Sequence, residues 1–247
     1  MTLNALTYQI YEALNITSDD TDIPERLIWD LIAQSRENAV KNEITKFRTP
    51  HTVFIQMLTC FPVEMVDDTF CCVLGFSTDC KMAKTVNPLP TPIATNSKPA
   101  IFSVGPSIAS ATRFSYVTYE QAIDSGNSRF TRTLVYAFVV NGYMYFVSKN
   151  QKLIVTLSKV DIHGIWANPV DLAPYMNCSG KPCFSPEKSE YPLTGGLWQT
   201  MVKPYVIQEL AMKYQLPKDR MSNAEDDATK AGGQKIKGPG VPKEEAG

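Results

Sequence analysis

The sequence predicts an α+β fold: an N-terminal antiparallel helical hairpin, a central antiparallel β-barrel or sandwich, and a C-terminal amphipathic helix with an extended tail. Apolar residues recur at helical spacing over residues 3–47, and the same spacing returns over residues 197–214. Between them, short aromatic and β-branched runs alternate with turn signals. At 247 residues and 44% hydrophobic content, the chain can bury a substantial core.

The first predicted domain, residues 1–49, contains two helices. The first runs from about Leu3 to Leu14, and the second runs from Pro24, which suits a first helical turn, to about Phe47. The acidic loop NITSDDTDIP connects them. A connection this short predicts that the two helices run antiparallel.

The second predicted domain, residues 50–190, is rich in β-structure. Its strongest local signal is Asn141-Gly142 between two aromatic runs, a pair that favours a two-residue type I′ hairpin turn. The segment KLIVTLSKVDIHGIW predicts one further strand or two. The proline-rich segment NPLPTPI predicts a sheet edge or a crossing segment.

The C-terminal part is predicted to be a helix over residues 191–216 that packs on the body, followed by an extended arm over 217–247. Pro204 lies inside the helical pattern and predicts a kink or break there. The arm carries six acidic and six basic residues and few apolar ones, a composition typical of a segment that is disordered on its own.

The charge balance argues against a dedicated nucleic-acid binder, because the chain has 24 basic and 25 acidic residues and so lacks an excess of positive charge. The first basic residue is Arg26, so no secretory signal is expected. The longest apolar stretch, residues 134–147, is too short to span a bilayer. We therefore expect a soluble protein made in a cytosol, with no membrane partner.

Six cysteines are the most conspicuous candidates for chemistry: Cys60, Cys71, Cys72, Cys80, Cys178 and Cys183. Only the last two have spacing at the edge of a zinc motif, so the set is a weak candidate for metal binding. A four-thiolate site that combines cysteines from residues 60–80 with Cys178 and Cys183 stays open. The favoured interpretation is that all six are reduced and act as small apolar residues, since disulfides are not expected in a reducing cytosol.

No enzyme motif is present. The chain has two histidines, His51 and His163, and each is interpreted as a surface or core-edge residue. Neither a G-x-S-x-G nucleophile elbow, nor a phosphate-binding loop, nor G-x-G-x-x-G occurs. The acidic pairs at 67 and 226 lie in a turn-like segment and in the tail. The sequence therefore predicts no catalytic residue and no cofactor.

The order of several sequence features along the chain is similar to that of a known family. A helical pair bearing Arg36 precedes a cysteine cluster that ends at Cys80, and NGYMYF, GIWANP and an amphipathic helix follow. Pro217, Asp219 and Asn223 come last. In this order the chain resembles the structural ring or adaptor proteins below the portal of crAss-like tailed podoviruses. It departs from them after Cys80, where KMAKTVNPLP has fewer basic residues than they carry.

The resemblance implies a virion protein, assembled in the bacterial host cytoplasm, that is a subunit of a ring in the portal-proximal head-to-tail connector. It implies a homo-oligomeric ring of twelvefold symmetry whose neighbours are the portal protein and other ring or tail proteins. Double-stranded DNA would pass through it without sequence-specific recognition. Pro217, Asp219 and Asn223 are the interface residues that this hypothesis singles out.

A second hypothesis belongs to another class: a zinc-stabilised or ligand-binding β module without catalysis. Its cysteines would hold the metal, and exposed aromatics would stack on sugars or bases. The candidates for stacking are Tyr143, Tyr145, Trp166 and Trp198. Aromatics at alternating strand positions more often belong to a core or an interface, which favours the ring hypothesis.

Overall fold

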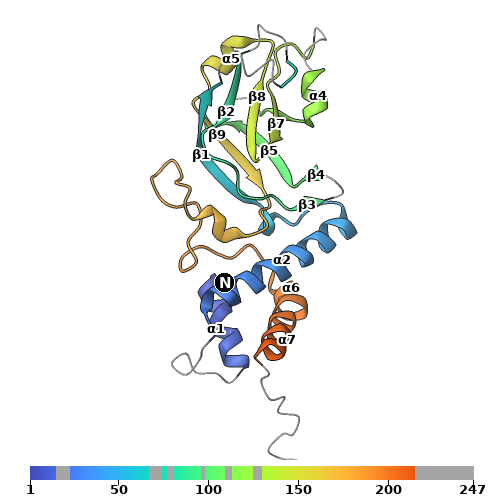
Figure 1. The fold of residues 1–247 in the computed structure, drawn as a ribbon, viewed down its shortest axis with the longest axis vertical. Helices are drawn as coiled ribbons and strands as arrows, with labels where there is room; N and C mark the ends of the chain where they lie inside the picture. The colour runs from blue at the N-terminus through green and yellow to red at the C-terminus, as the bar shows by residue number, and fades with distance from the viewer. Residues whose placement is uncertain are drawn as a thin grey trace, which may run out of the picture. The chain divides into compact units, whose positions relative to one another are not determined.

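The computed structural model describes residues 1–14, 23–66, 74–76, 81–95, 98–108, 113–124 and 130–214 (Figure 1). The chain divides into a unit of residues 1–207 and a second unit that begins at Gln208. The described residues combine N-terminal helices, a seven-stranded sheet and a C-terminal helix, so the predicted α+β class is confirmed.

The two N-terminal helices are α1 (Leu3–Ala13) and α2 (Glu25–Phe47), close to the predicted bounds. The hydroxyl of Thr2 caps α1 by accepting from the Ala5 amide at 3.3 Å. The indole of Trp29 on α2 donates to the Thr7 hydroxyl on α1 at 3.1 Å. The helices are therefore joined by a polar contact as well as by their buried apolar faces.

The central sheet has the strand order β5-β9-β1-β2-β8-β7-β6, in which only β6 and β7 pair in parallel. The strands are β1 (Gln56–Met65), β2 (Met82–Thr85), β5 (Ile101–Pro106), β6 (Ser115–Tyr116), β7 (Tyr136–Val140), β8 (Tyr143–Val147) and β9 (Lys159–Gly164). At the open edge, the Phe114 amide donates to the Val104 carbonyl at 2.7 Å. This contact nearly closes the sheet into a barrel.

Short elements connect the strands. They are η1 (Thr52–Phe54), the two-stranded ladder of β3 (Ala94–Thr95) and β4 (Lys98–Pro99), α4 (Tyr119–Ile123), α5 (Gln151–Val155) and η2 (Pro169–Leu172). The segment KLIVTLSKVDIHGIW contains one strand, β9, as predicted, and the place of a possible second strand is taken by the α5 turn. Short apolar runs do not distinguish helix from strand by periodicity.

The predicted hairpin turn is confirmed. Asn141 and Gly142 connect β7 and β8 with φ values of 50° and 81°, as a type I′ turn requires. The proline-rich segment contributes an isolated bridge between Pro92 and Trp166 outside the named strands, as expected for a crossing segment.

Two apolar clusters of described residues stabilise the fold. One lies between the sheet and α4 and includes Val66, Leu74, Met82, Ala122, Tyr136, Phe138, Tyr145 and Val147. The other joins α2 to the sheet and consists of Val40, Ile44, Phe54, Ile93, Ala100 and Ile165. The second cluster fixes α2 against one end of the barrel.

The C-terminal elements are α6 (Gly195–Leu197), η3 (Trp198–Val202) and α7 (Lys203–Lys213). The irregularity expected at Pro204 takes the form of the π-helical turn η3 directly before it. Pro204 itself occupies the first turn of α7, where its missing N–H is tolerated. Among the described helices, none is both long and apolar enough to cross a membrane.

Candidate functional site

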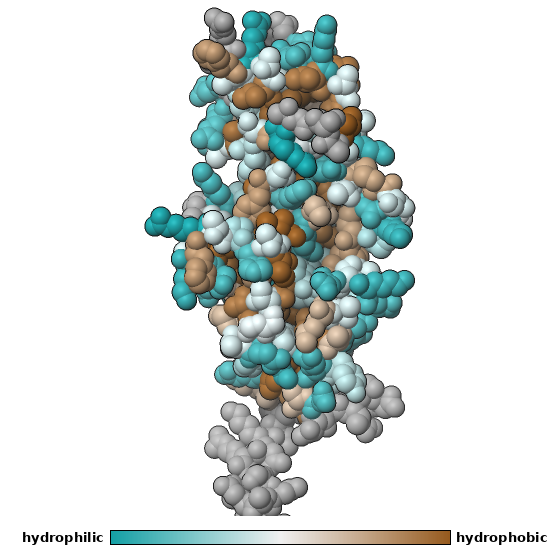
Figure 2. Space-filling model, turned by 180° about the vertical axis from the view of Figure 1, so that it is seen from behind, coloured by the Kyte–Doolittle hydropathy of each residue, from teal (hydrophilic) through white to brown (hydrophobic). Residues whose placement is uncertain are grey.

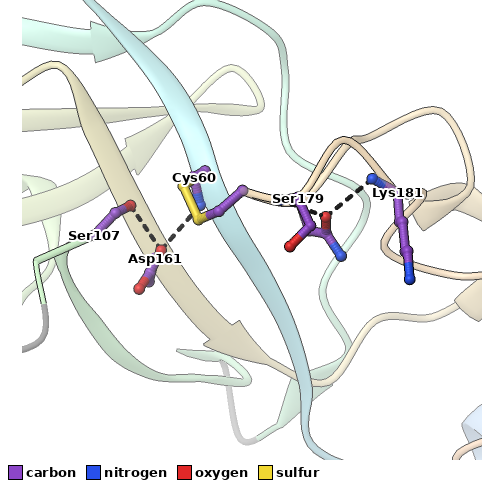
Figure 3. Close-up of a disulfide and its surroundings, with 7 residues drawn as sticks. Cys60, Ser107, Asp161, Ser179 and Lys181 are labelled. Carbon is purple, nitrogen blue, oxygen red and sulfur yellow. Dashed lines mark hydrogen bonds between the residues drawn. A yellow bond between two sulfur atoms is a disulfide. The ribbon is translucent and has the colours of Figure 1, made fainter.

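Cys60 lies at an irregularity in β1. The register of β1 against β9 shifts between Leu58 and Phe61, and Cys60 adopts a φ of 56° in this bulge. Its amide donates to Asp161 Oδ1 on β9 at 2.9 Å, and the Ser107 hydroxyl donates to the same oxygen at 2.7 Å (Figure 3). Asp161 therefore holds the bulged backbone in place.

Cys178 lies in a tight turn within the loop of residues 175–183. The side-chain oxygen of Asn177 accepts from the amides of Ser179 at 2.9 Å and Lys181 at 3.0 Å (Figure 3). Gly180 adopts a φ of 71°, which glycine reaches without steric cost. The Asn177 amide also donates to the Lys181 carbonyl at 2.7 Å, so the turn is stabilised by its own hydrogen bonds.

A disulfide joins Cys60 to Cys178 across 118 residues, with the Cα atoms 5.1 Å apart (Figure 3). The expectation that all six cysteines are reduced is therefore wrong for this pair. That expectation came from the cellular compartment and from sequence spacing, and neither reports which strand and loop are neighbours. A bonded pair supplies no thiolates to a metal, so a four-thiolate site containing both is not formed.

Cys183 is a free thiol in the same region. Its amide donates to the Tyr175 carbonyl at 2.7 Å, which closes the base of the 175–183 loop. Burial raises the pKa of the Cys183 thiol, against the lowering effect of a hydrogen bond with the Thr59 backbone. Cys60, Cys178 and Cys183 thus all lie near the β1 bulge.

The other three cysteines, Cys71, Cys72 and Cys80, lie outside the described residues, as do the interface candidates Pro217, Asp219 and Asn223. Within the described ranges, no group of three or more His, Cys, Asp or Glu side chains could hold a metal ion. The part of CCVLGFSTDC that is described forms a turn at Leu74-Gly75, and Leu74 is buried in the sheet cluster.

A second notable site is the buried guanidinium of Arg36 on α2. Its Nε donates to the Pro192 carbonyl at 2.9 Å, and its Nη1 donates to the Trp166 carbonyl at 2.8 Å. The group also lies 5.8 Å from the ring centroid of Tyr191. Burial lowers the pKa of Arg36 by removing its charge from water, while Tyr191 and Glu37 act in the opposite direction.

Several polar atoms at this junction are buried without a hydrogen-bond partner in the described structure. They are Arg36 Nη2, the Trp166 indole nitrogen and the Tyr191 hydroxyl. Full burial raises the pKa of Tyr191 to about 12, although the Arg36 charge acts in the opposite direction. The junction therefore joins three chain segments with an incompletely satisfied polar network, which is costly in a protein interior.

The aromatic residues proposed for stacking do not form an exposed binding surface. Trp166, Trp198 and Tyr145 are buried, and only Tyr143 is partly exposed. Trp198 donates its indole N–H to Gln9 Oε1 at 2.7 Å, which ties η3 to α1. These aromatics belong to the core, contrary to the ligand-binding alternative.

The two histidines occupy separate places. His51 is exposed and caps η1 through Nδ1, which accepts from the Val53 amide at 3.2 Å. His163 is half-buried on β9 and lies opposite Met57. Burial and the charge of Arg113 lower the pKa of His163, whereas Asp161 raises it. Neither histidine is hydrogen-bonded to a candidate nucleophile in the described structure.

Sequence reasoning did not identify the Cys60–Cys178 pairing or the burial of Arg36 against backbone carbonyls. The burial of Arg36 had a signal in the sequence, since its position falls on the apolar face of α2 beside Ile32, Ala39 and Val40. No comparable signal pairs Cys60 with Cys178.

Comparison with known proteins supports the ring hypothesis. No curated protein matches the chain. A family model described as phage tail ring protein 2 matches residues 5–228, which include most of α1, all of α2, the whole sheet and the C-terminal helix. The chain therefore belongs to the phage tail ring protein 2 family of crAss-like phages.

Proposed function

We propose that this tail ring protein forms one ring of the portal-proximal head-to-tail connector and that its role is structural, without catalysis. The observation that carries the proposal is the family match over residues 5–228, since it reaches every described element. Membership of this family makes the chain a structural component of the virion that assembles as an oligomeric ring. Its place next to the portal is the proposed refinement.

A closed ring needs head-to-tail contacts between unlike surfaces of neighbouring subunits. The outer face of β1, β9 and β5 offers one such surface. Met57 and Phe102 are 56% and 44% exposed, and the half-buried His163 lies between them on β9. Apolar areas also reach the surface on the face of the molecule shown in Figure 2. We assign the strand face around Met57 and Phe102 to the contact between neighbouring subunits.

The near-neutral charge supports a role as a DNA conduit. With 24 basic and 25 acidic residues, the chain lacks the excess of positive charge that would hold DNA phosphates and slow their passage. Passage of double-stranded DNA would then be independent of sequence. A ring that joins directly to the portal would share its symmetry, which we propose to be twelvefold.

The arm of residues 217–247 supplies a further proposed contact. Pro217, Asp219 and Asn223 lie outside the described residues, and the hypothesis that they bind a neighbouring subunit rests on sequence alone. Removal of residues 220–247, which include Asn223, tests the proposed contact of the arm. Unchanged ring assembly and infectivity in the truncated phage would contradict this role.

Native mass spectrometry tests the proposed function directly. The full chain is measured alone and after mixing with the portal protein of the same phage. We expect a closed multiple of the chain mass, twelve copies in the complex, without stoichiometric metal. A monomer that carries zinc, or a chain that stays monomeric with the portal present, would contradict the connector role.

A further inference from the structure

We propose that Cys60 and Cys178 form a redox-sensitive lock: the chain folds and assembles with both as free thiols, and their disulfide closes once the particle leaves the host cytoplasm. This inference rests on the proposed function, which places assembly inside the host and the finished ring in a virion. Disulfides are rare in reducing cytosols, whereas they persist on particles in oxidising surroundings. Bond formation after assembly reconciles the disulfide with assembly in a reducing cytosol.

The first cysteine is positioned by contacts that do not need the disulfide. The bulge in β1 is fixed by the ladder to β9 on both sides of Cys60. Asp161 accepts from the Cys60 amide at 2.9 Å and from the Ser107 hydroxyl at 2.7 Å. These bonds hold the Cys60 backbone in the same place when the sulfur is reduced.

The loop that carries Cys178 is also held without the disulfide. The Tyr175 hydroxyl donates to the Pro88 carbonyl at 2.8 Å, and the Tyr175 ring lies 5.2 Å from the Phe61 ring next to the bulge. The Cys183 amide bonds to the Tyr175 carbonyl at 2.7 Å, and Asn177 closes the turn around Cys178. A reduced chain therefore presents both sulfurs to each other.

Exposure makes Cys178 the entry point for a small reagent, because it lies on an exposed turn while Cys60 is partly covered. Cys183 is half-buried, and burial raises the pKa of its thiol, so little of it is the reactive thiolate at neutral pH. Cys178 is therefore the first of the three cysteines to react, and Cys183 competes poorly with Cys60 for the bond to it.

The oxidant is a low-molecular-weight disulfide. The Cys178 thiolate attacks one sulfur of the reagent, forms a mixed disulfide and releases one small thiolate. The Cys60 thiolate then attacks the Cys178 sulfur, forms the protein disulfide and releases the second small thiolate. The protein loses two electrons and two protons, and one reagent molecule is reduced to two thiols.

The bond would add kinetic and thermodynamic resistance where no host machinery can refold the protein. It closes a covalent loop of more than a hundred residues that contains eight of the nine described strands entirely and part of β1. Cross-links that span long loops restrict the unfolded chain most strongly. The lock therefore acts on unfolding and leaves the folded ring geometry unchanged.

The experiment uses the full chain purified under reducing conditions and then equilibrated with reduced and oxidised glutathione. Alkylation and peptide mapping identify the bonded pair. Circular dichroism, oligomeric mass and Tm are measured on both forms. We expect a Cys60–Cys178 bond with Cys183 free, the same spectrum and mass in both forms, and a Tm about 10 °C higher when oxidised.

Two variants make the result specific. Cys178→Ser is expected to keep the fold and to lose the dependence of Tm on glutathione. Cys183→Ser is expected to keep both the fold and the dependence of Tm on glutathione. Bonding of Cys183 to either partner, absence of any bond, or an unfolded reduced chain would overturn the proposal.

The timing is measured by acid quenching and peptide mapping of particles taken from infected cells and of released virions. Free thiols inside and disulfide outside support the lock, and bonded protein in both samples overturns it. Oligomeric mass is a separate readout. A chain that forms the bond but no ring contradicts the proposed function and not the cysteine chemistry.

Discussion

Arg36 donates from Nη1 to the backbone carbonyl of Trp166 at 2.8 Å, across 130 residues of sequence. Its Nε reaches the Pro192 carbonyl at 2.9 Å, so one fully buried side chain on α2 binds both the segment after β9 and the segment before α6. The helices and the sheet are joined at this residue by hydrogen bonds rather than by apolar packing alone.

Replacement of Arg36 by Met keeps the volume and removes both donors. We expect the free energy of unfolding to fall by about 2–4 kcal/mol, because two buried carbonyls lose charge-assisted hydrogen bonds. Urea denaturation measures it. The matched control is Lys41→Ala on the same helix, where an i,i+4 ion pair with Glu37 is partly exposed and contributes at most about 0.5 kcal/mol. Equal losses in both variants would contradict a special role for Arg36.

Tyr191→Phe tests the cost of the unpaired hydroxyl. The change keeps the aromatic ring beside Arg36 and removes a buried polar atom that has no partner in the described structure. We expect unchanged or greater stability at neutral pH. A clear loss would show that the hydroxyl has a bonded partner, such as an internal water.

The same variant changes the alkaline limb of the stability curve. The folded pKa of Tyr191 is about 12 against an ordinary 10, so the folded state binds more protons between these values. Stability therefore falls as pH rises through that window. Tyr191→Phe should lessen the fall, measured as Tm against pH, and part should remain because the pKa of Tyr116 is also raised to about 12.

His163→Gln is expected to flatten the mildly acidic limb. Burial lowers the folded pKa of His163 below its ordinary 6.5, so the unfolded state binds more protons and stability is lost as pH falls below that value. Tm of both proteins at pH 7.5 and about pH 5 measures the effect. An identical decrease in wild type and variant would contradict it, since groups common to both proteins would then account for the whole slope.

Gly164→Ala and Gly196→Ala form a contrasting pair. A Cβ on Gly164 would lie 3.1 Å from the Ala100 carbonyl and 3.3 Å from the Trp166 ring, so we expect a loss of about 1–2 kcal/mol. Gly196 lies in α6 with nothing within 4 Å of the new atom, and alanine there should stabilise by up to about 1 kcal/mol. Thermal unfolding of both variants measures the contrast, and equal effects would show that the Gly164 environment relaxes freely.

A charge at the strand face tests the proposed subunit contact. Met57→Glu with Phe102→Glu should prevent ring formation and leave Tm of the monomer within a few degrees, because both side chains are exposed. The control is Met176→Glu, an equally exposed methionine on the 175–183 loop. Rings of normal mass in the double variant would place the contact elsewhere.

Local features of the fold were predictable from sequence because their causes are local. The bounds of α1 and α2 follow from apolar spacing and from the Pro24 start, and the β7–β8 turn follows from the φ requirements of Asn141-Gly142. The α5 turn was not predictable, since the run containing Leu153 and Ile154 is too short for its period to be read.

Non-local features were not predictable for the opposite reason. The partner of Cys60 is chosen by the bulge in β1 and by the place of the 175–183 loop, and neither is encoded near either cysteine. The carbonyl partners of Arg36 carry no side-chain signature at all. Backbone acceptors can belong to any residue, so only the three-dimensional structure identifies them.

The pairing of β1 with β9 has a consequence for synthesis. Met57 faces His163, so β1 leaves the ribosome about a hundred residues before its neighbour, a delay of roughly 5–20 s at bacterial elongation rates. Both strands of the β7–β8 hairpin are synthesised within that interval, while the edge of β1 that pairs with β9 is still unpaired. Pro62 and Glu64 lie in the second half of β1. A proline and a charged residue disfavour pairing of an exposed strand edge with another nascent chain.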